Sequence, residues 1–579
     1  MRLGALSFAA VLALLAPAAH AGNPIQAENL RAGSGTVSLA PAPPRTIEGY
    51  TSQTSVLPGG SVTFHVSTNP AERYRIVIAR LGWYGGTGVR DVACLPACTD
   101  DEQGSPQPMP TLQAGREAIA GWPVTDTLQV PADWVSGYYV AQLVLTSGPN
   151  AGTGYQTYFV VRELPLRRSQ ILVQVPVNTW QAYNGWGGFS LYEFDYAKNV
   201  RASKVSFDRP YDWSLAGAQV PLVWELPLVR FLEREGYDVS YQTDVDTDQD
   251  PASLLQHRLV IDSGHDEYWT RTMFDAFAQA RDAGTNLAFM GANDSYWQIR
   301  YEDGGRTIVS YKSFSDPVAD PQMKTVRFRE LVPPVYECGL IGIQSQGVGL
   351  HWLPGDYAVN PAALSDPWFT GTGFAAGAIV RGVVSVESDT IPGNQTADSS
   401  CSHKLTVFFH RELGGDKDGN ADAVRYTNPS GARVFASGSH QWSWGLDGYR
   451  FNQGFDVPAD PGLQRFMENG LDDLGRPAAP IAISAGHIPT GILVRLSLYP
   501  DPRVHVEVFR HAGAAPFAFT AAGVVHVCPS VTTTCVDHPR IPGTYLYEAV
   551  TQDQWSSSFP TASRPAVALR HRLRHRHRR

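Results

Sequence analysis

The sequence predicts a multidomain protein that combines α/β and all-β architecture: a central doubly wound domain, flavodoxin-like or amidotransferase-like, flanked by immunoglobulin-like and fibronectin-like β-sandwiches. Three observations support this fold class. Apolar runs typical of strands alternate with runs of helical spacing in the middle of the chain. Runs with a period of two come before and after that region. Only 17% of residues are charged and 11% are aromatic, with 54 Gly and 42 Pro, which favours strands and ordered loops over helical bundles.

Residues 1–21 predict a secretory signal peptide. They contain Arg2, an apolar run and the small-residue cleavage site Ala19-His20-Ala21. We therefore expect an exported mature chain that starts near Gly22, in the periplasm or outside the cell. No later stretch approaches ~20 uninterrupted apolar residues, so we expect no transmembrane segment.

Residues 45–163 are expected to form the immunoglobulin-like sandwich. Apolar and polar residues alternate, as strands require, at 61–66, 74–78, 139–145 and 155–161. Turn residues such as Pro58-Gly59-Gly60 separate these runs.

Residues 168–475 are expected to form the central domain. Strands are predicted at 171–176, 237–241, 258–262, 285–290 and 433–437. Helical spacing covers 223–235, and it recurs through Met273, Phe274 and Phe277 until Gly284. Alternating strands and helices predict a largely parallel sheet with helices on both faces. The loop-rich interval from about 310 to 425 does not reveal the order of its elements.

Residues 480–565 are expected to form the fibronectin-like domain, with alternating runs at 492–498 and 545–550. Residues 566–579 predict a basic disordered tail, because 570–579 contains six arginines. The formal charge of the chain is −9, so its body is acidic and nucleic acid is not the expected partner. The expected partner is a small-molecule amide or a glycan; the oligomeric state stays open.

The six cysteines predict three disulfides in an oxidising compartment. Cys94 lies close to Cys98 and Cys528 lies close to Cys535, which leaves Cys338 for Cys401. A metal-thiolate site is the alternative, but neither short spacing is CxxC.

Polar and aromatic clusters follow three of the predicted strands, at 178–188, 264–269 and 291–297. Ligands gather at the carboxyl ends of strands in open α/β sheets, so these clusters are expected to converge. In an extended turn, residues two apart project to the same side, so His265 and Glu267 can face one pocket if the turn stays non-helical through Glu267. The alternative is structural, with Asp266 capping the next helix and Glu267 complementing its dipole.

Common catalytic signatures are absent: the sequence has no GxSxG, HExxH, P-loop or GxGxxG with an acidic partner. One acidic stretch has the odd-position spacing of a structural Ca²⁺ loop, with a solvated acidic loop as the alternative. Its residues are Asp416, Asp418, Asn420 and Asp422.

Four segments together resemble the large (beta) subunit of N,N-dimethylformamidase and its relatives, over roughly residues 45 to 450. They are Asn178–Gly188, Val205–Tyr211, Gly264–Trp269 and Gly291–Arg300. The resemblance implies a mononuclear iron held by two tyrosines and a glutamate, with a histidine and an asparagine nearby. Matched residue by residue, it implies Glu267, Tyr183 and Tyr211 as metal ligands, with Tyr192 and Tyr196 close by, and His265 and Asn293 as catalytic residues.

Elementary chemistry is consistent with this ligand set. Phenolates and carboxylates are hard anionic donors that suit Fe³⁺. A metal-bound hydroxide would attack the carbonyl of a C–N amide bond, His265 would shuttle protons, and Asn293 would orient the carbonyl or stabilise its oxyanion. The resulting hypothesis is that the protein is exported and acts as an amidohydrolase. The alternative is a non-catalytic cell-surface or polysaccharide-binding protein in which the α/β domain is a scaffold.

Overall fold

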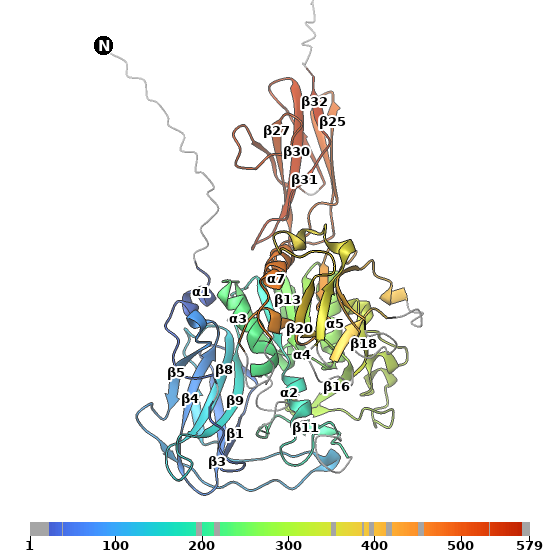
Figure 1. Ribbon diagram of the computed structural model, residues 1–579. Helices are drawn as coiled ribbons and strands as arrows, with labels where there is room; N and C mark the ends of the chain where they lie inside the picture. The colour runs from blue at the N-terminus through green and yellow to red at the C-terminus, as the bar shows by residue number, and fades with distance from the viewer. Residues whose placement is uncertain are drawn as a thin grey trace, which may run out of the picture.

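The computed structural model describes residues 22–569 except 38, 193–199, 213–220, 349–354, 385–386, 393–398, 413–419, 450–456 and 532. Most of the described structure is β-sheet with few helices, which confirms a β-rich multidomain protein. Figure 1 shows a blue N-terminal β unit beside a green and yellow central unit, from which the red C-terminal β unit projects. The predicted signal peptide, residues 570–579, Asp416 and Asp418 lie outside the described residues.

Two sheets form the N-terminal unit. One has the order β1–β3–β7, and the other has the order β2–β9–β8–β4–β5 with β6 paired to β4. The strand bounds are Ile47–Thr51 (β1), Ser55–Val56 (β2), Ser61–Thr68 (β3), Arg73–Leu81 (β4), Val89–Leu95 (β5), Glu102–Gln103 (β6), Asp126–Gln129 (β7), Gly137–Leu145 (β8) and Gly154–Val161 (β9). The period-two pattern explains the core, since Val62, Phe64 and Val66 are buried on one face of β3.

A nine-stranded sheet forms the centre of the molecule, in the order β12–β10–β13–β15–β24–β23–β22–β19–β20. Its first five strands are mutually parallel, and the remaining pairings are antiparallel. The five parallel strands are those predicted from the sequence. The strand bounds are Ile171–Val175 (β10), Val239–Thr243 (β12), Leu259–Gly264 (β13), Asn286–Gly291 (β15), Gly355–Val359 (β19), Ile379–Val384 (β20), Thr406–Arg411 (β22), Ala421–Thr427 (β23) and Arg433–Ala436 (β24).

Helices connect many of these strands. Apolar side chains at helical spacing form the buried stripe of α5, where Met273, Phe274 and Phe277 pack into the core. The α-helix bounds are Pro24–Asn29 (α1), Val177–Tyr183 (α2), Leu226–Arg234 (α3), Asp244–Gln249 (α4), Arg271–Asp282 (α5), Cys338–Ile341 (α6) and Pro461–Leu474 (α7).

Strands β13 and β15 bring two of the predicted polar clusters together. They are parallel, and Gly264 at the end of β13 is in register with Gly291 at the end of β15. A Cβ at Gly291 would lie 2.2 Å from the carbonyl oxygen of Gly264, so only glycine allows this approach. The loops that carry His265 and Asn293 therefore leave the sheet side by side.

Two small sheets consist of strands that the sequence did not predict, and the second of them comes from the interval left unordered. One has the order β11–β17–β16–β14, and the other is the antiparallel pair β18–β21. The bounds are Lys204–Ser206 (β11), Tyr268–Thr270 (β14), Trp297–Glu302 (β16), Thr307–Val309 (β17), Gln344–Val348 (β18) and Glu387–Thr390 (β21). Strand β14 starts directly after Glu267, so the turn that follows β13 stays extended.

The C-terminal unit contains the sheets β25–β26–β29 and β28–β27–β30–β31, with β32 paired to β30. The bounds are Ala482–Ile488 (β25), Gly491–Ser497 (β26), His505–Ala512 (β27), Val525–Val531 (β28), Thr534–Asp537 (β29), Gly543–Gln552 (β30), Thr561–Ala562 (β31) and Ala566–Ala568 (β32). Strand β32 is ordered by pairing with β30, so the unit extends past residue 565 into the segment predicted to be a disordered tail.

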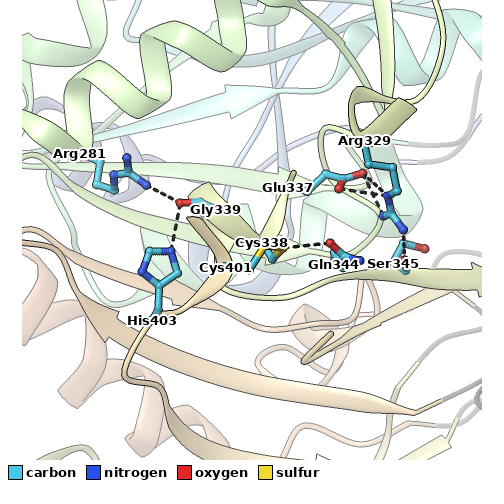
Figure 2. Close-up of a disulfide and its surroundings, with 9 residues drawn as sticks. All are labelled: Arg281, Arg329, Glu337, Cys338, Gly339, Gln344, Ser345, Cys401 and His403. Atoms are coloured by element: carbon cyan, nitrogen blue, oxygen red, sulfur yellow. Dashed lines mark hydrogen bonds and ion pairs between the residues drawn. A yellow bond between two sulfur atoms is a disulfide. The ribbon is translucent and has the colours of Figure 1, made fainter. Parts of the chain in front are cut away.

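All three predicted disulfides are confirmed: Cys94–Cys98, Cys338–Cys401 and Cys528–Cys535. Figure 2 shows the Cys338–Cys401 bond, where Glu337 pairs with Arg329 and the Arg329 guanidinium donates to the carbonyl of Ser345 on β18. Because β18 pairs with β21, this disulfide braces the antiparallel pair that carries Glu387. Along the part of the chain that the structure describes, no helix is long and apolar enough to cross a bilayer.

Candidate metal and catalytic site

Two phenols meet one carboxylate at the end of β13. The Tyr183 hydroxyl donates to Oε2 of Glu267 at 2.9 Å. The Tyr192 hydroxyl lies 2.6 and 2.7 Å from the two carboxylate oxygens of Glu267, and 3.2 Å from the Tyr183 hydroxyl. Three hard oxygen donors from α2, the loop after it and the β13 turn thus converge on one point.

The turn between β13 and β14 fixes the direction of Glu267. Its backbone N–H donates to Thr179 Oγ1 at 2.9 Å, and its carbonyl accepts from the Trp297 N–H. Helix α5 starts only at Arg271, and Thr270 caps it by accepting from the Met273 N–H. Asp266 is therefore not the helix cap, so the structural alternative for this turn is wrong on that point; Asp266 instead accepts a hydrogen bond from Gln174.

A second donor group lies against the first. His265 Nε2 is 2.7 Å from Oε2 of Glu387 and 3.7 Å from Oε2 of Glu267. His265, Glu387 and His440 each offer one ligand atom within 4.8 Å of the others. The three residues come from the β13 turn, the start of β21 and the loop after β24, respectively.

Asn293 supports this second group. It adopts a left-handed backbone with φ of 60°, which asparagine tolerates better than most residues. Its N–H donates to Asp389 at 2.9 Å, and its Nδ2 donates to Oε2 of Glu387 at 3.1 Å. Its amide oxygen is buried and has no hydrogen-bond partner among the described residues, so it can accept a bond from a ligand.

Charge pairing sets the protonation of the second group. Burial alone would lower the pKa of His265, but the charge and hydrogen bond of Glu387, with the charge of Glu267, raise it to about 9. Burial would raise the pKa of Glu387, but His265 holds it at about 2. Burial and the nearby His265 charge lower the pKa of His440 to about 3, so His440 is a neutral imidazole.

For the two phenols, Tyr183 and Tyr192, the surroundings favour the neutral form. Burial and then the charge of Glu267 raise the pKa of Tyr183 and of Tyr192 well above the ordinary value. Burial and Glu387 raise the pKa of Glu267 itself, against His265 and Lys312, which lower it. The Lys312 ammonium lies 3.4 Å from the centroid of the Tyr192 ring. Without a further cation, both phenols therefore keep their protons.

The structure brings together Tyr183, His265, Glu267 and Asn293, but it places Tyr211 elsewhere. Tyr211 lines a small cavity with Trp180 and Arg306, and its carbonyl accepts from Tyr155. No described contact joins Tyr211 to Glu267. Tyr192, on the loop after α2, lies beside Glu267 instead.

Sequence reasoning did not single out three residues that line this site, Glu387, His440 and Lys312. Tyr192 was only a neighbouring alternative. His440 follows β24 within the polar run 438–444, so its strand-end position was a usable signal. Glu387 and Lys312 lie in the interval whose order was not predictable, and no local pattern distinguishes them.

A buried set of oxygen and imidazole donors at the carboxyl ends of parallel strands is the kind of site that metal-assisted hydrolases use. Comparison with protein families indicates a hydrolase-like family. A model described as N,N-dimethylformamidase beta subunit-like, C-terminal, matches residues 75–456, which is well over half of the chain. The chain belongs to this family. A comparison with curated proteins gave no match.

Proposed function

We propose that this family member is an exported amidohydrolase that cleaves a C–N amide bond of a small molecule with iron held by Tyr183, Tyr192 and Glu267. The observation that carries the proposal is the convergence of two phenol hydroxyls on one buried carboxylate. In this proposal Tyr192 replaces Tyr211, which the resemblance to the family implied as a ligand.

The donor set fits a trivalent iron. Two phenolates and a carboxylate supply three negative charges on hard oxygen atoms. Without a cation the three groups are crowded: burial and the charge of Glu267 raise the pKa of both phenols, and burial and Glu387 raise the pKa of Glu267. A cation reverses that effect, since metal ligation favours the deprotonated form of its ligands. When bound, iron would supply Lewis acidity toward water and an amide carbonyl.

The remaining side chains would bind and protonate the substrate. Asn293 presents a buried amide, which orients a polar group of the substrate. His265 is protonated and paired with Glu387, so its imidazolium can give a proton to the departing amine nitrogen and recover it from water. Their burial excludes bulk solvent: His265 is 6% exposed and Asn293 is 4% exposed.

The proposal also covers the types of domain that make up the protein and its location. The parallel run β12–β10–β13–β15–β24 supports a doubly wound domain at 168–475, and the sheets on either side support an immunoglobulin-like domain at 45–163 and a fibronectin-like domain from 480. Three disulfides support export to the periplasm or beyond.

Metal analysis with absorption spectroscopy tests the proposal. Purified protein is expected to contain iron and to show a visible phenolate-to-iron band, and to hydrolyse a member of a panel of small N-alkyl amides. Tyr192→Phe and Tyr183→Phe are expected to weaken the band and the hydrolysis. Tyr211→Phe, the matched control, is expected to retain both. A colourless protein that takes up no iron, or a band lost only in Tyr211→Phe, would refute the assignment.

A further inference from the structure

The second donor group has features that the iron proposal does not use. His440 is 3% exposed, and both of its ring nitrogens are buried without a hydrogen-bond partner among the described residues. Buried imidazole nitrogens almost always have partners, because leaving them unpaired costs roughly 1–3 kcal/mol each. Such a side chain needs a ligand to account for its position.

The surroundings hold the His440 ring in place and leave its nitrogens available. The Trp224 ring packs on it with centroids 4.4 Å apart, and Trp224 stacks in turn on Trp444 at 5.4 Å. The His265 ring lies on another side, with centroids 4.9 Å apart. Apolar packing therefore positions the imidazole, while its polar edge faces His265 and Glu387.

We propose that His265, Glu387 and His440 form a metal-binding set of their own, separate from the phenol set, that takes a borderline divalent cation of the Zn²⁺ class. Two imidazole nitrogens and one carboxylate oxygen are a ligand combination that Zn²⁺, Co²⁺ and Fe²⁺ accept, with open positions left for water. A hard trivalent ion prefers the all-oxygen set beside it.

The three donor atoms are already close to the separations that a bound ion requires. The three ligand atoms lie within 4.8 Å of one another. Bonds of about 2.0–2.1 Å place tetrahedral ligand atoms roughly 3.3 Å apart. The most distant donors must therefore approach by up to about 1.5 Å, whereas His265 Nε2 and Glu387 Oε2, now 2.7 Å apart, must separate slightly; side-chain rotation provides both movements. Asn293 donates to Oε2 of Glu387, as second-shell residues do when they orient a carboxylate ligand.

The set also has the charge that a divalent ion needs. Glu387 and Glu267 place two carboxylates on one side of His265, at 2.7 and 3.7 Å from Nε2. An ion at this set would take the His265 lone pair and stop it from carrying a proton. If the proposed amide hydrolysis holds, Zn²⁺ is therefore an inhibitor; the binding claim itself does not depend on that activity.

Titration of chelator-treated full-length protein with Co²⁺ tests the proposal, with equilibrium dialysis for affinity and visible ligand-field bands for nitrogen ligation. His440→Gln and Glu387→Gln are each expected to weaken Co²⁺ binding at least tenfold. His403→Gln, which removes a half-buried imidazole bonded to the Gly339 carbonyl, is the matched control and is expected to bind like the wild type. The histidines at 571, 575 and 577 are present in every variant, so the difference between variants isolates the site.

Tyr192→Phe separates this proposal from the iron proposal. It is expected to weaken the phenolate-to-iron band and to keep Co²⁺ binding, whereas His440→Gln is expected to keep the band and to weaken Co²⁺ binding. Zinc-edge absorption of the wild type is expected to show two imidazole ligands, which provides a test even if a variant fails to fold. Wild-type Co²⁺ affinity in folded His440→Gln, no Co²⁺ uptake by the wild type, or zinc without imidazole ligation would overturn the proposal.

Discussion

The protonation state of each residue in this site depends on the charges that surround it. His265 is buried and Glu387 is largely buried, with side chains 8% and 13% exposed, and each holds the other in its charged form. A buried pair of this kind is costly to break, because the remaining charge has no partner. The chemistry of the site therefore depends on a carboxylate that lies more than a hundred residues further along the chain.

Glu387→Gln is expected to lower the pKa of His265 from about 9, because burial lowers it and Glu387 is the largest of the groups that oppose burial, ahead of Glu267 and Asp294. In the wild type the raised pKa stabilises the fold below pH 6.5, and this contribution is lost as pH rises from 6.5 through about 9. NMR titration of the His265 imidazole in metal-free protein measures the shift. An unchanged His265 pKa would show that Glu387 is not its partner; His403→Gln serves as the control.

Glu225 is a buried acid whose raised pKa destabilises the fold at high pH. Burial raises its pKa to about 8, while the Trp180 indole that donates to it at 3.3 Å lowers it. The unfolded chain loses this proton near 4.5, so the stability contribution falls as pH rises from 4.5 through about 8. Glu225→Gln is expected to raise the melting temperature at pH 9 by several degrees and to change it little at pH 5. An equal effect at both pH values would contradict the assignment.

At the scale of elements, two neighbouring strand ends and one antiparallel strand pair place four of the side chains at the site. Strands β13 and β15 deliver His265, Glu267 and Asn293 through parallel pairing. The β18–β21 pair delivers Glu387 from outside the main sheet. The site is therefore as stable as these two pairings.

Gly291→Ala is expected to disturb the site through the backbone. The added methyl would meet the Gly264 carbonyl oxygen at 2.2 Å, so β13 and β15 must separate where the two loops begin. We expect a loss of at least about 2 kcal/mol in unfolding free energy, as for other overpacked positions, and a loss of iron. Gly486→Ala, where a Cβ meets nothing within 4 Å, is the matched control for urea unfolding. Equal stability of the two variants would rule out this close approach.

The Cys338–Cys401 disulfide is expected to matter for Glu387 as well as for stability. It spans 63 residues, and losing a loop of that size typically costs about 2–4 kcal/mol. Replacing both cysteines with serine is expected to loosen the β18–β21 pair and to weaken Co²⁺ binding at His265, Glu387 and His440. The matched control replaces Cys94 and Cys98, which close only a four-residue separation far from the site in the sequence. Unchanged hydrogen exchange in β21 would count against the bracing role.

At the scale of the whole molecule, buried ion pairs join the three units. Arg80 on β4 pairs with Glu233 on α3 at 2.7 Å, with both side chains fully buried. Arg258, beside β13, pairs with Asp553 at 2.6 Å and with Asp501 at 2.9 Å in the C-terminal unit. The flanking β units are therefore tied to the central unit by charges that water does not screen.

Arg258→Met is expected to uncouple the C-terminal unit. It leaves the buried carboxylate of Asp553 without its cation, while Asp501 keeps Arg503 at 2.9 Å, and breaking one buried pair costs about 3–5 kcal/mol in comparable cases. Calorimetry is expected to show a lower or split unfolding transition. Arg381→Met, at a side chain that is 79% exposed, is the control and is expected to unfold like the wild type. A single unchanged transition in Arg258→Met would show that the pairs do not join the units.

The sequence by itself determined the strands of the parallel sheet, the cysteine pairing and the His265–Glu267 turn. Each of these depends on local periodicity or on elimination among few alternatives. Only the tertiary structure decided that Tyr192 and not Tyr211 lies beside Glu267, and that Glu387 and His440 complete a second donor group. Those contacts depend on how loops and antiparallel strands distant in sequence return to one sheet edge. Local hydrophobic pattern fixes which face a residue occupies, but it does not fix the path by which a distant segment reaches that face.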